Sequence, residues 1–395
     1  MQYPLMRNNI TREDLDEVIK LLQTEDPKLT SGPKVLEFEK KWSEWLGVKY
    51  SIFVNSGSSS NLLAIAWLKN KFPNGGKIIV PPFTWSSDIS SVLWMGFDPE
   101  FVDINMKTLA IDEDKFEEKI SRNNDIRAIF LTHAQGINGL TEKIYSLCKK
   151  HNIFLIEDVC ESHGVNSIFN KKAGSIGDIS CFSYYYAHHM STIEGGMVCT
   201  NDKNIYEFLI MSRAHGMLRE SKDREIQAEY KKNYQDLNPL FIFPMKGFNF
   251  RNNEIGATIG LNQLKRLDEM IEIRKKNFSY FLNGLPNWAF KDFDLKGQSN
   301  YAFNLILKDK DNKLMSNLQE TLNNNGIEFR KGSAGGGNQI RQPYVRSLGK
   351  YLDEEIPIIF PISDHIHFYS MYIGNYPSLT FKEIDLLLEK INGIK

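Results

Sequence analysis

Residues 50 to 61 of the chain read YSIFVNSGSSSN. The first five, Tyr50 to Val54, form an apolar run bounded by small polar residues, which is typical of a buried β-strand. The polar residues that follow open a helical stretch from Asn61 to Lys69. Because a buried strand followed at once by a helix is the repeating unit of a parallel sheet, this stretch predicts an α/β fold.

The same alternation of apolar runs and helical stretches continues to about residue 200. Helical patterns such as Glu142 to Lys150 separate the runs, which indicates a mostly parallel sheet covered by helices on both faces. The further apolar runs lie at 77–80, 126–131, 153–156, 179–182 and 197–200.

The remaining segments divide the chain into two expected domains, a large one at 1–265 and a small α+β one at 266–395. The polar residues 219–238 indicate a long surface loop. The expected helices and strand outside the alternating region are a helix from Thr11 to Leu22, a helix from Lys34 to Leu46 that ends at Gly47, a bridging helix at 253–277, a strand at 301–307, and helices at 313–324 and 381–391.

Composition limits the function. The 48 basic and 49 acidic side chains nearly cancel, so no whole-protein field would draw the chain onto nucleic acid or an anionic membrane. No apolar run approaches the roughly 20 residues that span a bilayer, and no signal peptide precedes the first helix, so we expect a cytoplasmic protein. The cysteines show no CxxC spacing and are expected to be reduced and structural; they are Cys148, Cys160, Cys181 and Cys199.

Two strand ends carry candidate ligand-binding groups. The turn from Asn55 to Asn61 could cradle a phosphate at the positive end of the following helix, or could simply be a capped turn. Glu157 and Asp158 end another apolar run, and ligands of open α/β sheets bind outside the carboxyl ends of the strands. A carboxylate there can keep a ring nitrogen protonated, or can cap the next loop.

The segment from Ser183 to Gly196, SYYYAHHMSTIEGG, is rich in polar aromatic residues. Core packing explains it poorly, because each buried polar tip would need its own partner. A metal pair is disfavoured, because adjacent histidines on a strand point to opposite faces. A proton-transfer histidine and a structural histidine both remain open.

Several motifs together resemble the nucleotide-sugar aminotransferase family of pyridoxal 5′-phosphate (PLP) enzymes, over about residues 30 to 390. The resemblance implies an aspartate aminotransferase-like (fold type I) large domain with a mostly parallel seven-stranded sheet, a smaller α+β C-terminal domain, and a homodimer whose active site is shared across the interface. The motifs are, in order, SGSSSN, PPFTW, EDVCESHG, SYYYAHHMSTIEGG, SRAHG and GFNFRNNEIGATIGLNQL.

The resemblance also implies a set of cofactor contacts. Trp85 would stack on the pyridine ring, and Asp158 would pair with the ring nitrogen, which makes the ring an electron sink. Glu161 stands where many relatives have glutamine, near the cofactor hydroxyl. The phosphate would be held by Gly57, Ser58 and Ser183, with Asn249 reaching across from the second subunit.

One position departs from the family. The family's lysine lies five residues after the serine that corresponds to Ser183, and this position is His188; no lysine occurs between Ala173 and Asp202. A histidine cannot bond covalently to the cofactor, which argues against transamination as the net reaction. A base without an amine can instead take a proton from the cofactor's C4′ carbon and pass it to a departing hydroxyl.

This departure resembles the lysine-less sugar 3-dehydratases of the family, of the type that acts on GDP-4-keto-6-deoxymannose. The resemblance implies that the pyridoxamine form of the cofactor, made from glutamate, removes the C3 hydroxyl of a nucleotide-linked 4-keto-6-deoxyhexose. The products would be a 3,6-dideoxy-4-keto sugar for O-antigen synthesis and ammonia. Two rivals are an aminotransferase with a displaced lysine, from Lys171 or Lys172, and a non-catalytic PLP-binding sensor subunit.

A sister type of dehydrase carries an iron–sulfur cluster on cysteines that follow the His-Gly motif. No cysteine occurs here from Ala214 to Asn249, so we expect no cluster. The segments 337–344 and 373–380 nevertheless look closer to that sister type, which leaves the nucleotide open between GDP, CDP and dTDP.

Four further residues are substrate-binding candidates. Arg219, Arg251 and Arg330 could bind a diphosphate or the carboxylates of the amino donor, or could form surface ion pairs. His215 could hydrogen-bond near the cofactor, or could cap a helix. The glycine-rich stretch 332–337 lacks the Lys-Ser/Thr pair of a nucleotide-triphosphate loop and is expected to form a mobile loop over the site.

Overall fold

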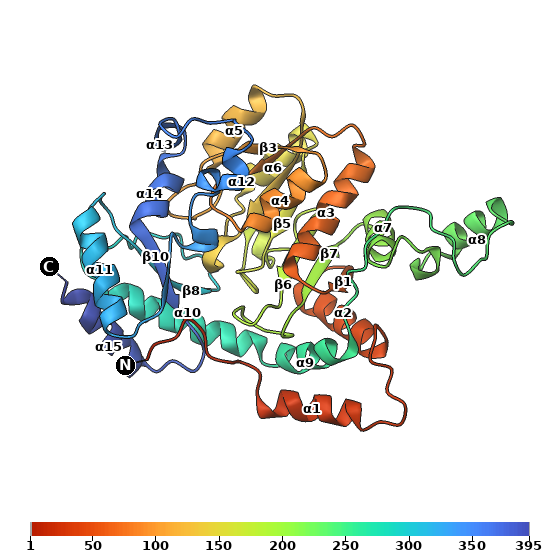
Figure 1. The fold of residues 1–395 in the computed structure, drawn as a ribbon, viewed down its shortest axis with the longest axis horizontal. Coiled ribbons are helices and arrows are strands. Elements are labelled where there is room, and N and C mark those ends of the chain that lie inside the picture. Colours follow the sequence, from red (N-terminus) through yellow and green to blue (C-terminus); the bar gives the residue numbers. More distant parts are fainter. Residues whose placement is uncertain (1, 395) are drawn as a thin grey trace.

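The computed structural model describes residues 2 to 394, and its centre is a seven-stranded sheet (Figure 1). The strand order is β1-β7-β6-β5-β4-β2-β3, and only β7 runs antiparallel to its neighbours. The expected mostly parallel sheet is therefore confirmed. Its strands are β1 Tyr50–Val54, β2 Lys77–Val80, β3 Asp98–Phe101, β4 Ile126–Thr132, β5 Phe154–Asp158, β6 Ile179–Ser183 and β7 Gly196–Thr200.

Helices cover both faces of this sheet, as successive side chains of one strand show. Ile52 and Val54 pack into the apolar cluster that holds the inner side chains of α3, α4 and α7, whereas Phe53 between them packs into the cluster of α2 and α9. The helices of this part are α1 Arg12–Leu22, α2 Pro33–Leu46, α3 Gly57–Lys71, α4 Ser86–Trp94, α5 Glu113–Ser121, α6 Glu142–His151, α7 Lys203–Arg213 and α9 Glu254–Leu264.

Local sequence signals set the ends of the first two helices. Thr11 and Asp14 form a reciprocal capping box at the start of α1. Gly47 ends α2 with φ at 84°, a left-handed conformation that glycine adopts without steric cost. Both expected helices are confirmed.

A second, three-stranded antiparallel sheet in the order β8-β10-β9 lies towards the C-terminus. Phe281, Phe303 and Ile384 bring α10, β8 and α15 into one apolar cluster, so this part has its own core. Val345 and Phe360, in contrast, pack against the large sheet. The elements are α10 Leu267–Gly284, β8 Ala302–Ile306, α11 Asn312–Asn324, β9 Phe329–Lys331, α12 Pro343–Arg346, α13 Ile356–Ile359, α14 Pro361–Tyr369, β10 Ser370–Gly374 and α15 Phe381–Asn392.

Two expected segments were wrong in detail. The expected bridging helix at 253–277 is two helices, α9 and α10, with a break at Lys265 and Arg266, where we propose the boundary between the large and small domains. The expected loop at 219–238 contains the helix α8, Arg224–Asn233.

The carboxylate of Asp223 accepts hydrogen bonds from the first backbone amides of α8. The helix buries none of its residues, and most of them are charged or polar, which is why the sequence of this stretch resembled that of a loop. In Figure 1, α8 projects from the body of the molecule as an arm. Within residues 2 to 394, no helix is both long and apolar enough to cross a membrane.

Candidate active site

The turn between β1 and α3 forms a cradle at one end of the sheet. Gly57 is the first residue of α3, and the hydroxyl of Ser56 caps the helix by accepting a hydrogen bond from the backbone amide of Ser59 at 3.0 Å. Ser58 is exposed, and Ser183 ends the strand β6, which lies two strands from β1 in the sheet. The first backbone N–H groups of a 15-residue helix can thus receive an anion beside two serine hydroxyls.

Asp158 ends β5 with a buried carboxylate, which accepts a hydrogen bond from the backbone amide of Cys160 at 2.8 Å. Its neighbour on the adjacent strand β4 is Thr132. The hydroxyl of Thr132 donates to a second buried carboxyl, that of Asp88, at 3.1 Å. Thr132 therefore connects the end of β5 to a second acidic side chain, Asp88.

Asp88 was not identified from the sequence. It also accepts hydrogen bonds from Asn61 Nδ2 at 2.6 Å and from the hydroxyl of Thr84. Burial, and then the charge of Asp158, raise the pKa of Asp88 well above its ordinary value. The raised pKa favours the neutral form of Asp88.

Trp85 lies at the N-cap of α4, one turn before Asp88, and 57% of its surface is exposed. An indole so open to solvent has a free face on which a planar ligand can stack. The loop 332–337 packs beside it, since a Cβ atom at Gly335 would lie 2.2 Å from the Thr84 carbonyl oxygen.

His188 lies in the loop between β6 and β7 with its ring partly buried among other rings. The ring centroids of Tyr301, Tyr185 and His163 are 5.5, 6.1 and 6.2 Å from its own. Its Nδ1 has no hydrogen-bond partner within residues 2 to 394. Burial, and then the charge of Arg274, lower the pKa of His188 to about 3, so the imidazole is neutral.

The adjacent histidine has a different environment. Nε2 of His189 is hydrogen-bonded to the carbonyl oxygen of Ser299 at 2.9 Å, and its ring is buried. The structural reading therefore fits His189, which is anchored through Nε2, although its Nδ1, like that of His188, has no hydrogen-bond partner within residues 2 to 394.

Glu161 lies close to the aromatic rings around His188. It accepts hydrogen bonds from the backbone amide and the side-chain amide of Gln135, both at 3.1 Å. Burial raises the pKa of Glu161 to about 7, and its charge acts in turn on Tyr301 and Tyr372. The two tyrosines, 6.0 Å apart between centroids, were not identified from the sequence. We call Glu161, Tyr185, His188, Tyr301 and Tyr372 the His188 cluster.

The three candidate arginines lie in different places. Arg330 is exposed on β9 opposite Tyr372, so it borders the His188 cluster. Arg251 pairs with Val54 at the end of β1, close to the cradle, and its Nε donates to Asn249 Oδ1 at 3.2 Å. Arg219 lies at the base of the arm, 5.3 Å from the centre of the Phe241 ring.

His215 and Asn249 lie on the two segments that run to and from the arm. The backbone amide of His215 donates to the Phe248 carbonyl at 2.6 Å, and its side chain is exposed. Asn249 pairs with Ala214 and is also exposed. In the described part of the chain, the side chain of neither residue is hydrogen-bonded to the His188 cluster.

These groups fit a PLP molecule. A helix N-terminus with serine hydroxyls suits its phosphate, a buried carboxylate suits its pyridinium nitrogen, and an exposed indole suits its ring face.

A sequence profile of the DegT/DnrJ/EryC1/StrS aminotransferase family matches residues 8–392. The chain belongs to this family. It is therefore an enzyme that uses PLP, in agreement with the donor set above.

Curated relatives in the family have two kinds of activity. The chain is 32% identical to a GDP-4-keto-6-deoxy-D-mannose 3-dehydratase of Escherichia coli O55:H7 over 98% of this chain and 99% of that protein. It is 33% identical to a UDP-4-amino-4,6-dideoxy-N-acetyl-β-L-altrosamine transaminase of Campylobacter jejuni over 69% of this chain and 67% of that protein.

Among solved structures, GDP-4-keto-6-deoxymannose-3-dehydratase with a trapped PLP-glutamate geminal diamine superposes with a TM-score of 0.86. The two chains are 29% identical, and the match covers 99% of this chain and 100% of the other. The expected fold type is thereby confirmed.

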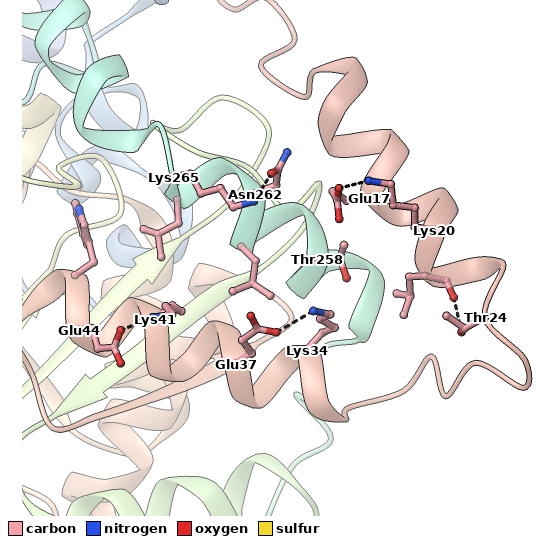
Figure 2. Close-up of a pocket in the computed structure, with 14 residues that line it drawn as sticks. Glu17, Lys20, Thr24, Lys34, Glu37, Lys41, Glu44, Thr258, Asn262 and Lys265 are labelled. Atoms are coloured by element: carbon pink, nitrogen blue, oxygen red, sulfur yellow. Dashed lines mark hydrogen bonds and ion pairs between the residues drawn. The ribbon is translucent and has the colours of Figure 1, made fainter.

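A groove of about 650 Å³ between α1, α2 and α9 contains none of these groups (Figure 2). Its charged side chains are bonded to one another, as in Lys20 with Glu17 at 2.7 Å and Lys34 with Glu37 at 2.9 Å. Because these charges are already paired and solvated, the groove has no obvious group to select an ion, and we assign it no role.

Proposed function

We propose that the protein removes the C3 hydroxyl of a nucleotide-linked 4-keto-6-deoxyhexose, with glutamate as amino donor, and releases ammonia and a 3,6-dideoxy-4-keto sugar. GDP-4-keto-6-deoxymannose is the favoured substrate. The observation that carries the proposal is His188, a neutral imidazole with a free Nδ1 at the position of the family's lysine. Both dehydratases and transaminases are relatives, so this residue decides between them.

We assign the binding of the cofactor to the groups at the strand ends. Gly57, Ser58 and Ser183 would hold the phosphate, Trp85 the ring face, and Asp158 the protonated ring nitrogen. In its pyridoxamine form the cofactor supplies an amine for the C4 ketone of the sugar and a ring that accepts electrons. Asn249 of a second subunit would complete the phosphate site in a homodimer.

His188 would act twice on one proton. Its unprotonated nitrogen would first take a proton from the C4′ carbon of the cofactor. The same proton then passes to the departing C3 hydroxyl, which leaves as water. The protonated imidazole of His188 is a strong acid in this environment because its pKa is low, so it gives the proton up readily. One water then releases the sugar as an enamine, which tautomerises to an imine, and a second water hydrolyses the imine to the C4 ketone and ammonia.

The neighbouring side chains would orient the substrate. Tyr301 and Arg330 line the side of the His188 cluster that the small sheet contributes. We propose that Arg330 binds the diphosphate of the sugar nucleotide or the carboxylates of glutamate, with Arg251 near the cradle as a second contact. Arg219 and His215 remain weaker candidates at the base of the arm.

The direct test incubates the protein with PLP, glutamate and either GDP- or CDP-linked 4-keto-6-deoxyhexose, with no reductase present. Mass spectrometry would detect loss of water from the sugar, and a coupled assay would detect ammonia. Turnover without a reductase would exclude the iron–sulfur type. The His188→Asn protein should lose dehydration, whereas His151→Asn, an exposed histidine at the end of α6, should keep it. Wild-type turnover by His188→Asn would show that the assignment is wrong.

The rival aminotransferase would need a displaced lysine. The Nζ of Lys172 donates to the Trp45 carbonyl at 2.6 Å and lies 4.3 Å from the centre of the Trp45 ring, so it is already engaged elsewhere. That rival predicts an amino sugar as product. A non-catalytic sensor subunit predicts no ammonia with any 4-keto sugar, and the retained pair of Asp88 and Asp158 argues against it, because sensing does not require an electron sink.

A further inference from the structure

Arg274, on α10, is a fully buried cation that the reaction above does not use. Its Nη1 donates to the carbonyl oxygens of Tyr301, at 2.9 Å, and Asn375. Its Nη2 lies 3.4 Å from the carbonyl oxygen of His188. Within residues 2 to 394, no carboxylate forms a salt bridge with it, so only neutral dipoles surround the charge.

An unpaired buried charge is costly, and such a residue needs a reason to persist. Burial lowers the pKa of Arg274 to about 10, so the guanidinium stays protonated at neutral pH. Its contacts come from three segments, the loop of His188, the segment before β8 and the segment after β10. Arg274 therefore links these three segments by hydrogen bonds and places a fixed positive charge next to the backbone of His188.

No carboxylate offsets that charge at the ring of His188. The rings around it belong to Tyr185, Tyr301 and His163. The ring of His189 lies 5.4 Å from that of His163, and burial, and then the charges of Arg274 and His163, lower the pKa of His189. The acid in this region, Glu161, holds its own proton up to about neutral pH. Protonation of His188 would thus place a second positive charge close to the first.

We propose that Arg274 is a positioning residue that keeps the imidazole of His188 unprotonated before the reaction and makes its protonated form a strong acid during it. The proton taken by the ring then passes to the departing hydroxyl instead of staying on the ring. The chemical consequence rests on the proposed dehydration. The electrostatic relation does not, and it can be measured without substrate.

A matched control is available at the same carbonyl. Asn9 Nδ2 also lies 3.4 Å from the carbonyl oxygen of His188 and could donate to it, but carries no charge. The Asn9→Ala substitution removes a local anchor of the loop. Arg274→Gln removes the charge and keeps donor groups, and Arg274→Lys keeps the charge. The three variants separate the effect of charge from that of anchoring.

The experiment follows the imidazole nitrogens of cofactor-free protein by NMR, with ¹⁵N-labelled histidine, from about pH 3 to about pH 8, a range that includes both the lowered pKa of His188 and the ordinary histidine pKa. The spectrum of His188→Asn identifies the signal by its loss. We expect no protonation of His188 above about pH 5 in wild type, Asn9→Ala and Arg274→Lys. In Arg274→Gln we expect the midpoint to rise by about one to one and a half pH units, because burial is the larger cause of the lowered pKa and remains in this variant.

Several outcomes would overturn the proposal. One is an unchanged midpoint in Arg274→Gln; another is an equal rise in Asn9→Ala, which would mean that anchoring alone matters. If Arg274→Gln does not fold, an ordinary midpoint near 6.5 in wild type would be sufficient to reject it. Failure of the proposed function would be distinguishable, since it would leave these midpoints as expected while no sugar is dehydrated.

Discussion

A Cβ atom at Gly57 would lie 2.6 Å from the Cβ atom of Ser183. Real Cβ atoms do not approach so closely, so the start of α3 and the end of β6 touch in a way that only glycine allows. The same Cβ atom would lie 3.2 Å from Cys160 Sγ, which blocks relief on that side. The cradle proposed for the cofactor phosphate depends on this contact.

Gly57→Ala should therefore weaken cofactor binding. The added methyl group must push the helix N-terminus away from Ser183, which misplaces the amides that would face the phosphate. We expect the dissociation constant of PLP to rise at least about tenfold, equivalent to about 1.4 kcal/mol. Titration followed by fluorescence would measure it.

Gly256→Ala is the matched control for this substitution. Gly256 lies in the first turn of α9, where a Cβ atom would come no closer than 3.4 Å to its neighbours. Its PLP affinity should equal that of wild type. If Gly57→Ala binds PLP as tightly as Gly256→Ala does, the phosphate is held elsewhere.

The sequence predicted each half of this contact but not the contact itself. A strand followed by SGSSSN was compatible with an anion site or a capped turn, and the resemblance to the family pointed to Ser183. Their proximity depends on sheet order, which places β6 two strands from β1, and no local signal encodes that order. The sequence did place Asp158 at the carboxyl end of a strand, where ligand groups lie in parallel sheets, and its role as a cofactor contact stays a prediction.

Asp88→Asn should be tolerated, because the buried carboxyl of Asp88 is held in its neutral form. The new amide can accept from Asn61 through its oxygen and donate through its nitrogen toward Asp158 and the hydroxyls of Thr84 and Thr132, which can rotate to accept. We expect an unfolding temperature near that of wild type at neutral pH and retained PLP binding. Thermal unfolding and PLP titration would measure these two properties.

Asp88→Ala provides the contrast, because it leaves Asn61, Thr84 and Thr132 without their acceptor. It should lose about 2 to 4 kcal/mol of stability, since buried donors would remain unsatisfied. Equal losses in Asp88→Asn and Asp88→Ala would mean that Asp88 is ionised in the folded protein.

Asp88 shows why part of the site escaped sequence reasoning. An acid in the first turn of a helix is expected on helix-dipole grounds alone, so TWSSD carried no signal of function. Arg274 likewise resembles a surface residue of an amphipathic helix. Tyr301 and Tyr372 belong to the small sheet and the segment before it. They reach the His188 loop only because the small sheet packs against the large domain, which no local sequence pattern predicts. The arm helix α8 was missed because most of its residues are charged or polar and none is buried.

Glu161 should make the stability of the cofactor-free protein depend on pH. Its pKa is raised to about 7 in the folded protein, so the folded state holds a proton that the unfolded state loses near 4.5. The resulting stabilisation is complete below about pH 4.5 and disappears as pH rises through 7. The Glu161→Gln substitution removes this pH-dependent stabilisation, because glutamine does not titrate. The unfolding temperature of wild type should therefore fall relative to that of Glu161→Gln between those pH values, and parallel curves would contradict the raised pKa.

His188→Lys should restore the covalent attachment that the wild-type protein lacks. A lysine amine at this position condenses with the aldehyde of PLP, and borohydride then fixes the bond irreversibly. We expect peptide mass spectrometry to find a reduced cofactor adduct at residue 188 in the variant and none in wild type. His189→Lys is the matched control, because His189 faces the Ser299 carbonyl instead of the cluster, and it should give no adduct. An adduct at Lys171 or Lys172 of the wild-type protein would instead support the displaced-lysine aminotransferase, and His188 would then need another role.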